Sequence, residues 1–252
     1  ITFVFAIFSK SSVNLSDWFS ALTPISHGQY WYMSCYFGLV LIAPFLNQAV
    51  LTLKKEQLLP IVSGAFIYFS VIPTVFKQDI LGLWGGYSVL WMVLLYTIGA
   101  IIRKSNYESR FQIRNVSGFI LFLTSLTFIL CWLGFEQWRS YISPTVTLQG
   151  IAIFLLFLNI KDIPLTFKRL VLLISPLTLG VYLFHVHPLI FRRIIPTIHT
   201  LVEEQEFPIF VIMILVMTLA LFFSGAMIEY FRNKLMAYIL TLIKSVKNLK
   251  QT

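Results

Sequence analysis

Charged residues are scarce in this sequence. Only 12% of its 252 residues are Asp, Glu, Lys or Arg, against about a quarter in an ordinary soluble domain. Apolar residues make up 58%, and they gather in long, nearly uninterrupted runs. A chain of this size with so few charges would not stay in solution as a globular domain. The composition therefore excludes a disordered chain and a collagen-like fibre, and it favours a protein that crosses a membrane several times.

Cysteine and the common catalytic motifs are also nearly absent. Cys35 and Cys131 are the only two cysteines, and each lies inside an apolar run. We therefore predict buried free thiols and neither a disulfide scaffold nor a metal site. No glycine-rich phosphate loop, HExxH or GxSxG occurs, and nothing suggests a nucleic-acid partner or a bound cofactor. The alternating segments of a membrane β-barrel are missing too, so the predicted fold is all-α.

What the sequence does contain is a series of apolar runs long enough to cross a bilayer, which takes about 17–25 residues. Seven full runs follow a partial first one at residues 1–8, and no Gly/Ser-rich linker divides them. We predict a polytopic transmembrane helical bundle over residues 1–231 and a basic tail over residues 232–252. The predicted spans are residues 30–50, 58–76, 87–102, 116–135, 144–160, 170–191 and 208–231.

The net charge of +9 is distributed unevenly between the loops. Fourteen of the 19 Lys and Arg residues fall in one set of alternate loops and in the tail. The excess of positive charge in cytoplasmic loops predicts that this set, and the C-terminus, lie in the cytoplasm of a cell whose cytoplasmic membrane holds the chain. Apolar residues recur at helical spacing from Leu235 to Leu249. They predict either an amphipathic helix on the inner leaflet or a charged tail that stops translocation.

A polar stripe marks the sixth predicted span. Ser175, Thr178, Tyr182 and His185 follow steps of three, four and three residues, so a helix places them on one face. Polar groups in a bilayer are costly unless they face the bundle interior or a wet cavity. His185 and Tyr182 are thus candidate catalytic residues, and Ser175 and Thr178 candidate substrate contacts. A stripe that serves only helix packing is the alternative, and His187 points elsewhere and is interpreted as structural.

Three further groups of residues are candidates for binding. Tyr30 and Trp31 open the first full span on its outer side, where an aromatic belt at the membrane interface explains them as well as substrate contact does. Arg192 and Arg193 flank the outer end of the His185 helix, where they either bind an anionic sugar or lipid phosphate or extend toward the headgroups. Near the inner end of the last span, Glu229 is expected to pair with an arginine three residues later.

Two stretches resemble the acyltransferase-3 family of integral membrane O-acyltransferases, and the agreement in span spacing covers essentially the whole chain. The resemblance implies a bacterial enzyme that transfers an acyl group, most often acetyl, from cytoplasmic acyl-CoA to a hydroxyl of exopolysaccharide or another cell-surface polysaccharide. Acyl-CoA is then a co-substrate, and the partners are membrane lipid and a glycan or lipid-linked glycan acceptor. The matching residues are Tyr30, Trp31, Tyr32, Tyr36, Leu41, Pro44, Phe45, Leu46 and Asn47, then Ser175, Leu179, Gly180, Tyr182, Leu183 and His185.

The resemblance also implies roughly ten helices, an even count between cytoplasmic termini. The chain starts at Ile1 inside an apolar run, so we expect earlier helices that carry the family's catalytic histidine. On that expectation His185 and Tyr182 have a supporting role, and this chain alone is inactive. A carrier or flippase for a lipid-linked glycan, which would use the same stripe without acyl transfer, is the main competing hypothesis. A structural or sensory membrane subunit is another.

Overall fold

The computed structural model describes residues 19, 23, 30–79, 81–105, 112–160, 163–187, 190–191, 195–196, 200 and 205–249, with side chains as far as residue 242. Within these ranges the chain forms helices and no strand. It divides into two compact units, one formed by Trp31–Asp162 and the other by Ile1–Tyr30 together with Ile163–Thr252. Each unit is described by itself below.

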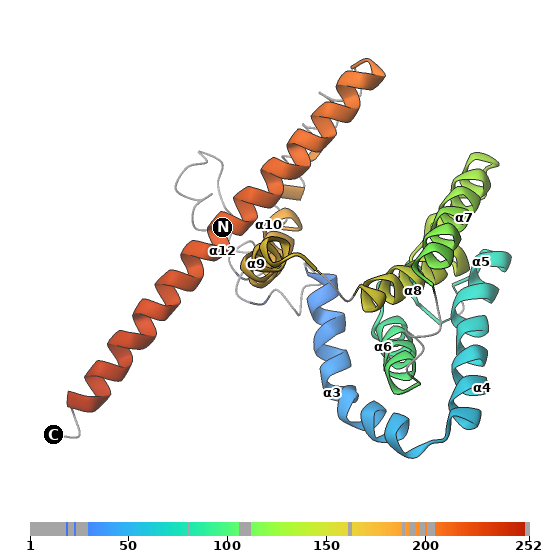
Figure 1. Cartoon of the computed structure of the whole chain (residues 1–252), viewed down its shortest axis with the longest axis horizontal. Helices are drawn as coiled ribbons and strands as arrows, with labels where there is room; N and C mark the ends of the chain where they lie inside the picture. Colours follow the sequence, from blue (N-terminus) through green and yellow to red (C-terminus); the bar gives the residue numbers. More distant parts are fainter. Residues whose placement is uncertain are drawn as a thin grey trace. The chain divides into compact units, whose positions relative to one another are not determined.

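The unit Trp31–Asp162 is a bundle in which α6 is the central helix. This helix packs against both α3 and α4, and α7 packs along α8 (Figure 1). The described core of this unit is built around Leu83, Trp91, Leu94 and Ile142. Its helices are α3 (Trp31–Thr52), α4 (Lys55–Phe66), α5 (Ile72–Phe76), α6 (Val89–Lys104), α7 (Ile113–Trp132) and α8 (Pro144–Asn159).

Local sequence explains where α6 and α8 begin. The Ser88 hydroxyl accepts a hydrogen bond from the Trp91 amide at 3.3 Å, and the Ser143 hydroxyl accepts one from the Val146 amide at the same distance. Such caps satisfy amides that the first helical turn leaves without a partner. Pro144 occupies the first position of α8, where its missing N–H costs nothing.

A π-helical turn, Ile67–Val71, joins α4 to α5. Pro73 follows it and cannot donate a backbone hydrogen bond, which favours an irregular turn at this point. Ser70, in the turn, is fully buried, and its hydroxyl donates to the Ile142 carbonyl at 2.5 Å. The Thr74 hydroxyl in turn donates to the Ser70 carbonyl at 2.7 Å. The Ser70 hydrogen bond therefore links the π-helical turn to the segment that precedes α8.

The second unit is built on a crossing of α10 over α12. Helix α9 (Leu165–Ile174) leads through a 3₁₀ turn, Ser175–Leu177, into α10 (Thr178–His185). Helix α12 (Phe207–Leu249) has 43 residues without a break and is about 64 Å long at 1.5 Å per residue. Small residues at the crossing let the two backbones approach closely, as in many membrane helix pairs.

The structure confirms the all-α, multi-pass fold. Among the described residues, six helical stretches are long and apolar enough to cross a membrane, and they coincide with six of the seven predicted spans. The remaining prediction, residues 87–102, corresponds to α6, a helix of 16 residues, or about 24 Å. The loop at Gly85 and Gly86 delays its start. The partial first span, residues 1–8, lies outside the described residues.

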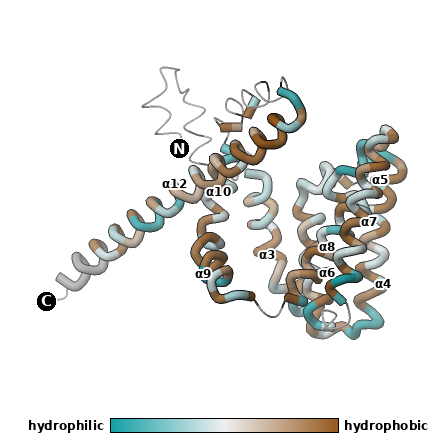
Figure 2. Tube along the Cα trace, turned by 45° about the horizontal axis from the view of Figure 1, so that its top comes forward, coloured by the Kyte–Doolittle hydropathy of each residue, from teal (hydrophilic) through white to brown (hydrophobic). Residues whose placement is uncertain are grey.

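The stretch after residue 231 is helical and continues α12 directly. Figure 2 shows the hydrophobic residues of α12 gathered in its first half and more polar residues toward its C-terminal end. The helix itself runs past residue 231, where the predicted bundle ends, as far as Leu249. Whether the last turns lie on a membrane surface stays a prediction.

Candidate functional site

Tyr30, Tyr182 and His185 form an aromatic cluster in the second unit. The rings of Tyr182 and His185 meet edge to face with centroids 5.8 Å apart, and Tyr30 lies 6.3 Å from Tyr182. All three side chains are half-buried. The i, i+3 spacing on α10 brings Tyr182 and His185 together, as the sequence predicts.

The imidazole of His185 is oriented by its own helix. Its Nδ1 lies 2.9 Å from the carbonyl oxygen of Val181, one turn earlier. A carbonyl can only accept, so this bond requires the proton on Nδ1 and leaves the lone pair on Nε2. In this tautomer Nε2 can accept a proton from a hydroxyl group, which is the property needed for general base chemistry.

Ser175 and Thr178 do not share the half-buried environment of Tyr182 and His185. Both are exposed, and the Thr178 hydroxyl donates to the Ser175 carbonyl at 2.8 Å. Ser175 lies in the 3₁₀ turn that contains Pro176, so the helical spacing on which the stripe depends is interrupted there. Arg192 and Arg193 lie outside the described residues.

His187 follows α10 and is only 7% exposed. Burial lowers the pKa of its imidazole to about 4, so the ring is neutral at physiological pH. Its backbone carbonyl accepts hydrogen bonds from the Ile190 and Phe191 amides at 2.9 and 2.8 Å. This placement matches the structural role expected from its position two residues after His185.

On the opposite side of α10, Gly180 of α10 and Gly225 of α12 let the two helices approach closely. A Cβ on Gly180 would lie 2.6 Å from Cγ of Glu229, and one on Gly225 would lie 2.8 Å from Cα of Val181. Glu229 is buried and accepts from Arg232 Nε at 2.7 Å and from Nη2 at 2.6 Å. The ion pair predicted from the i, i+3 spacing is thus confirmed, and it neutralises a carboxylate at the helix crossing.

A second aromatic cluster lies in the unit Trp31–Asp162. The ring of Trp31, at the start of α3, meets Tyr87 edge to face at 4.4 Å and lies 6.3 Å from Tyr141. Tyr87 and Tyr141 also meet edge to face, at 5.5 Å. The three residues come from segments far apart in the sequence. Trp31 and Tyr141 line one end of a cavity, and Tyr87 packs against both; the three rings are called the aromatic rim here.

The loop before Tyr87 is shaped by one carboxylate. Asp79 Oδ1 accepts from the Leu83 amide at 2.6 Å, and Oδ2 accepts from the Trp84 amide at 2.7 Å. Trp84, Gly85 and Gly86 all have positive φ angles, and glycine adopts such angles without strain. The Ser140 hydroxyl donates to the Gly85 carbonyl at 3.0 Å, which links this loop to the one that carries Tyr141.

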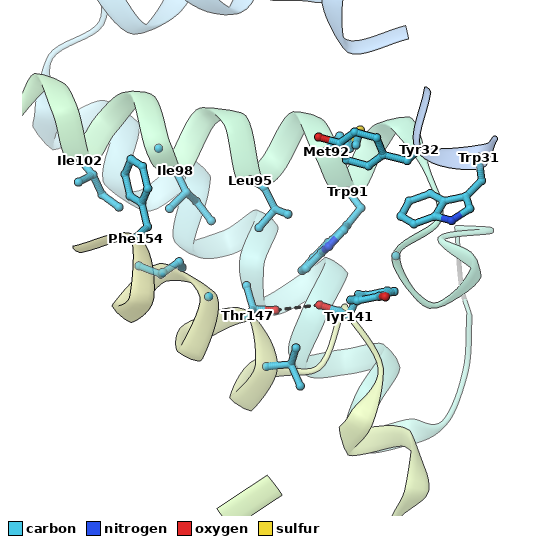
Figure 3. A pocket seen from close by; sticks show the side chains of 15 residues that line it. Trp31, Tyr32, Trp91, Met92, Leu95, Ile98, Ile102, Tyr141, Thr147 and Phe154 are labelled. Atoms are coloured by element: carbon cyan, nitrogen blue, oxygen red, sulfur yellow. Dashed lines mark hydrogen bonds between the residues drawn. The ribbon is translucent and has the colours of Figure 1, made fainter. Parts of the chain in front are cut away.

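The cavity behind this rim, called the aromatic groove here, runs between α6 and α8 with a volume of about 480 Å³. Figure 3 shows Trp31 and Tyr32 at one end, Ile102 and Phe154 at the other, and Leu95 and Ile98 between them. The Thr147 hydroxyl donates to the Tyr141 carbonyl at 3.3 Å beside it. Apart from such groups near the rim, the lining is apolar.

A second cavity, called the basic cavity here, lies between α3 and α6 and measures about 670 Å³. The Tyr96 hydroxyl donates to Asn47 Oδ1 at 2.8 Å. Lys104 Nζ donates to two carbonyls at the C-terminal end of α3, at 2.5 Å to Val50 in its last turn and at 2.8 Å to Leu53 just after it. Gly99 lines both the basic cavity and the aromatic groove.

Comparison with known proteins identifies the family of this chain. The family model described as "Acyltransferase domain" matches residues 1–241. The chain belongs to the acyltransferase-3 family. No curated protein and no solved structure matches it. With six membrane-crossing helices among its described residues, this acyltransferase-3 chain is a multi-pass membrane acyltransferase.

Sequence reasoning missed several residues of this acyltransferase. Tyr87 and Tyr141 were not candidates, although both lie, like Trp31, within three residues of the start of a predicted span. That shared position is a signal that could have identified the rim. Gly99 and Arg103 carried no such signal, because their importance depends on which faces of α6 meet α3 and α8.

Proposed function

We propose that this chain acts as a membrane O-acyltransferase that moves an acyl group, most often acetyl, from acyl-CoA to a hydroxyl of a cell-surface or exported glycan. The family match over residues 1–241 carries the proposal, because it includes every helix described here up to α12. Acyl-CoA serves as co-substrate, supplied from the cytoplasm. The protein resides in the cytoplasmic membrane with its C-terminus inside, in keeping with the loop distribution of Lys and Arg.

Acyl transfer to a hydroxyl requires a base near that hydroxyl and donors for the oxyanion that forms. The Nε2 lone pair of His185 is suited to accept a hydrogen bond from the acceptor hydroxyl, and the edge-to-face contact with Tyr182 keeps the ring in place. We assign both residues a supporting role in positioning the acceptor.

Acceptor contacts are the second part of the proposal. Tyr30 beside Tyr182, and Trp31 in the aromatic rim, provide flat apolar surfaces of the kind on which sugar rings stack. Ser175 and Thr178 place exposed hydroxyls on the helix that carries His185. Arg192 and Arg193 would pair with an anionic sugar or phosphate.

The test compares the O-acetyl content of the surface glycan in cells with the gene, without it, and with variants restored at equal membrane levels. We expect deletion to abolish O-acetylation and His185→Ala to lower it by about fivefold to tenfold, the effect of losing one hydrogen bond of about 1–1.5 kcal/mol to the acceptor. Tyr182→Phe should lower it less. Tyr238→Phe is the control, since Tyr238 is 63% exposed on α12.

Each alternative gives a different result in this experiment. If deletion leaves the O-acetyl content unchanged, the acyltransferase proposal fails. If deletion lowers the amount of exported glycan while the remaining glycan keeps its acetyl groups, the chain is a carrier. If His185→Ala retains full acetylation at normal membrane levels, the role assigned to His185 is refuted and the overall function stands.

A further inference from the structure

We propose that α6 carries a binding site for an amphiphile with a phosphate head group and one long aliphatic chain. The head group binds at Arg103 in the basic cavity, and the chain passes Gly99 and lies in the aromatic groove. This site shares no residue with the His185 cluster, and its test measures binding directly, so its failure and that of the proposed function can be told apart.

The shape and lining of the aromatic groove suit an aliphatic chain. Its volume of about 480 Å³ falls within the range of about 300–1,000 Å³ typical of ligand sites. None of the residues that line it is charged. Along α6 it extends from Trp91 to Ile102, which is about 16 Å at 1.5 Å per residue. A long, uncharged groove lined at one end by aromatic rings fits a chain better than a polar head group.

Glycines keep this groove open. A Cβ at Gly99 or at Gly150 would meet no atom within 4 Å. Larger side chains at these two positions would therefore project into space that neighbouring groups do not fill. Because both glycines line the groove, one on α6 and one on α8, a larger side chain at either position would occupy part of it.

The basic cavity supplies the complementary charge. Arg103 and Lys104 line it, and none of the residues that line it is acidic. Lys104 already donates to α3 carbonyls, so it adds positive charge more than further hydrogen bonds. Arg103 is exposed in the last turn of α6. A guanidinium group matches the geometry of a phosphate and can bind it through two parallel hydrogen bonds.

Gly99 connects the two cavities. Ile98 and Ile102 line the groove, whereas Tyr96 and Arg103 line the basic cavity, so the two cavities occupy neighbouring faces of α6. Gly99 lies on the border and lines both. A side chain there would stand between head group and chain, and its absence lets one molecule occupy both.

Two kinds of molecule combine a phosphate group with a long aliphatic chain and are possible sources of the ligand. They are a phosphate-bearing membrane lipid and a long-chain acyl-CoA. The direct probe is a lysophosphatidic acid whose single palmitoyl chain carries a terminal diazirine, added to the purified protein in phosphatidylcholine nanodiscs. After photolysis, mass spectrometry identifies the labelled peptides. We expect label on peptides from α6 around Trp91 and from α8 around Thr147, which lie toward the end of the groove away from Arg103, and much less label from a neutral monoacylglycerol with the same chain.

Variants separate the two halves of the site. Gly99→Leu should reduce labelling by about tenfold or more, since even one misplaced methylene in an apolar pocket has about this effect. Arg103→Gln should remove most of the preference for phosphate, also about tenfold, while the labelled peptides stay the same. Gly118→Leu and Arg114→Gln are the matched controls, because both residues are exposed on α7 and line neither cavity.

The milder Gly99→Ala keeps the test valid if Gly99→Leu fails to fold, since its Cβ meets no atom within 4 Å and it should still reduce labelling. Competition then identifies the source: displacement by palmitoyl-CoA assigns an acyl donor, and displacement by polyprenyl phosphate assigns a membrane lipid. Equal labelling by phosphate and neutral probes, label spread evenly over the helices, or full labelling of both Gly99 variants would overturn the proposal.

Discussion

Replacing Gly180 with alanine tests the helix crossing that supports the His185 cluster. The new Cβ would lie 2.6 Å from Cγ and 2.8 Å from Cδ of Glu229, well inside van der Waals contact. Overpacking of this kind costs about 1–3 kcal/mol, and the severity of the contact points to the upper end. Alanine gains about 0.8–1.0 kcal/mol over glycine in a helix. The net loss in unfolding free energy is therefore about 2 kcal/mol.

The assay is thermal unfolding of the purified protein in detergent at one fixed scan rate. A loss of about 2 kcal/mol lowers the Tm by about 4–8 °C for a chain of this size. Gly118→Ala is the control, since a Cβ there meets no atom within 4 Å. It should gain only the helix propensity and raise the Tm by about 2–4 °C.

A double-mutant cycle attributes the effect to one contact. Glu229→Gly removes the atoms that the new Cβ would meet, so Gly180→Ala in that background should be less destabilising by about 1–3 kcal/mol. If Gly180→Ala raises the Tm as Gly118→Ala does, or if the cycle shows no coupling, α10 and α12 do not touch at these residues and the described crossing is wrong.

Three further predictions concern single polar groups. Asp79→Ala leaves the Leu83 and Trp84 amides without their carboxylate acceptor. It should lower the free energy of unfolding by about 1–3 kcal/mol, with a matching drop in Tm. An unchanged Tm would mean that water replaces the carboxylate. Ser70→Ala removes the donor to the Ile142 carbonyl and should cost a similar amount, whereas exposed Ser63→Ala should not; equal effects would contradict the buried bond. His187 has a pKa of about 4 in the folded state and 6.5 in the unfolded state, so the unfolded state binds more protons. The free energy of unfolding should therefore fall by about 3 kcal/mol as the pH drops from 6.5 to 4. His187→Leu should flatten this pH dependence, and a pH profile parallel to that of the unchanged protein would refute the burial of His187.

Much of the helical framework is predictable because long apolar runs and capping residues are local features. Ser143 and Pro144 mark the start of α8, and the predicted residues 144–160 match Pro144–Asn159. The helix α7 begins earlier than predicted, at Ile113, because Arg114 and Asn115 continue the helix beyond the apolar run. Hydropathy identifies the part of a helix that suits hydrocarbon and not the whole of it.

The candidate sites divide in the same way. The contact between Tyr182 and His185 follows from their spacing on one helix, and so does the pair of Glu229 with Arg232. The aromatic rim does not, because Trp31, Tyr87 and Tyr141 come together only through the packing of separate segments. Helical spacing did not predict the 3₁₀ turn at Ser175 either, because it assumes one regular helix.

The unbroken length of α12 has a practical consequence for imaging a small membrane protein. After Gly225 the helix contains neither glycine nor proline as far as Leu249, so no residue in these 24 favours a kink. A soluble domain joined to Leu249 through continuous helix would be held about 36 Å from the α10 crossing at 1.5 Å per residue. Such a rigid fusion would serve as an orientation marker for electron cryo-microscopy of this membrane protein.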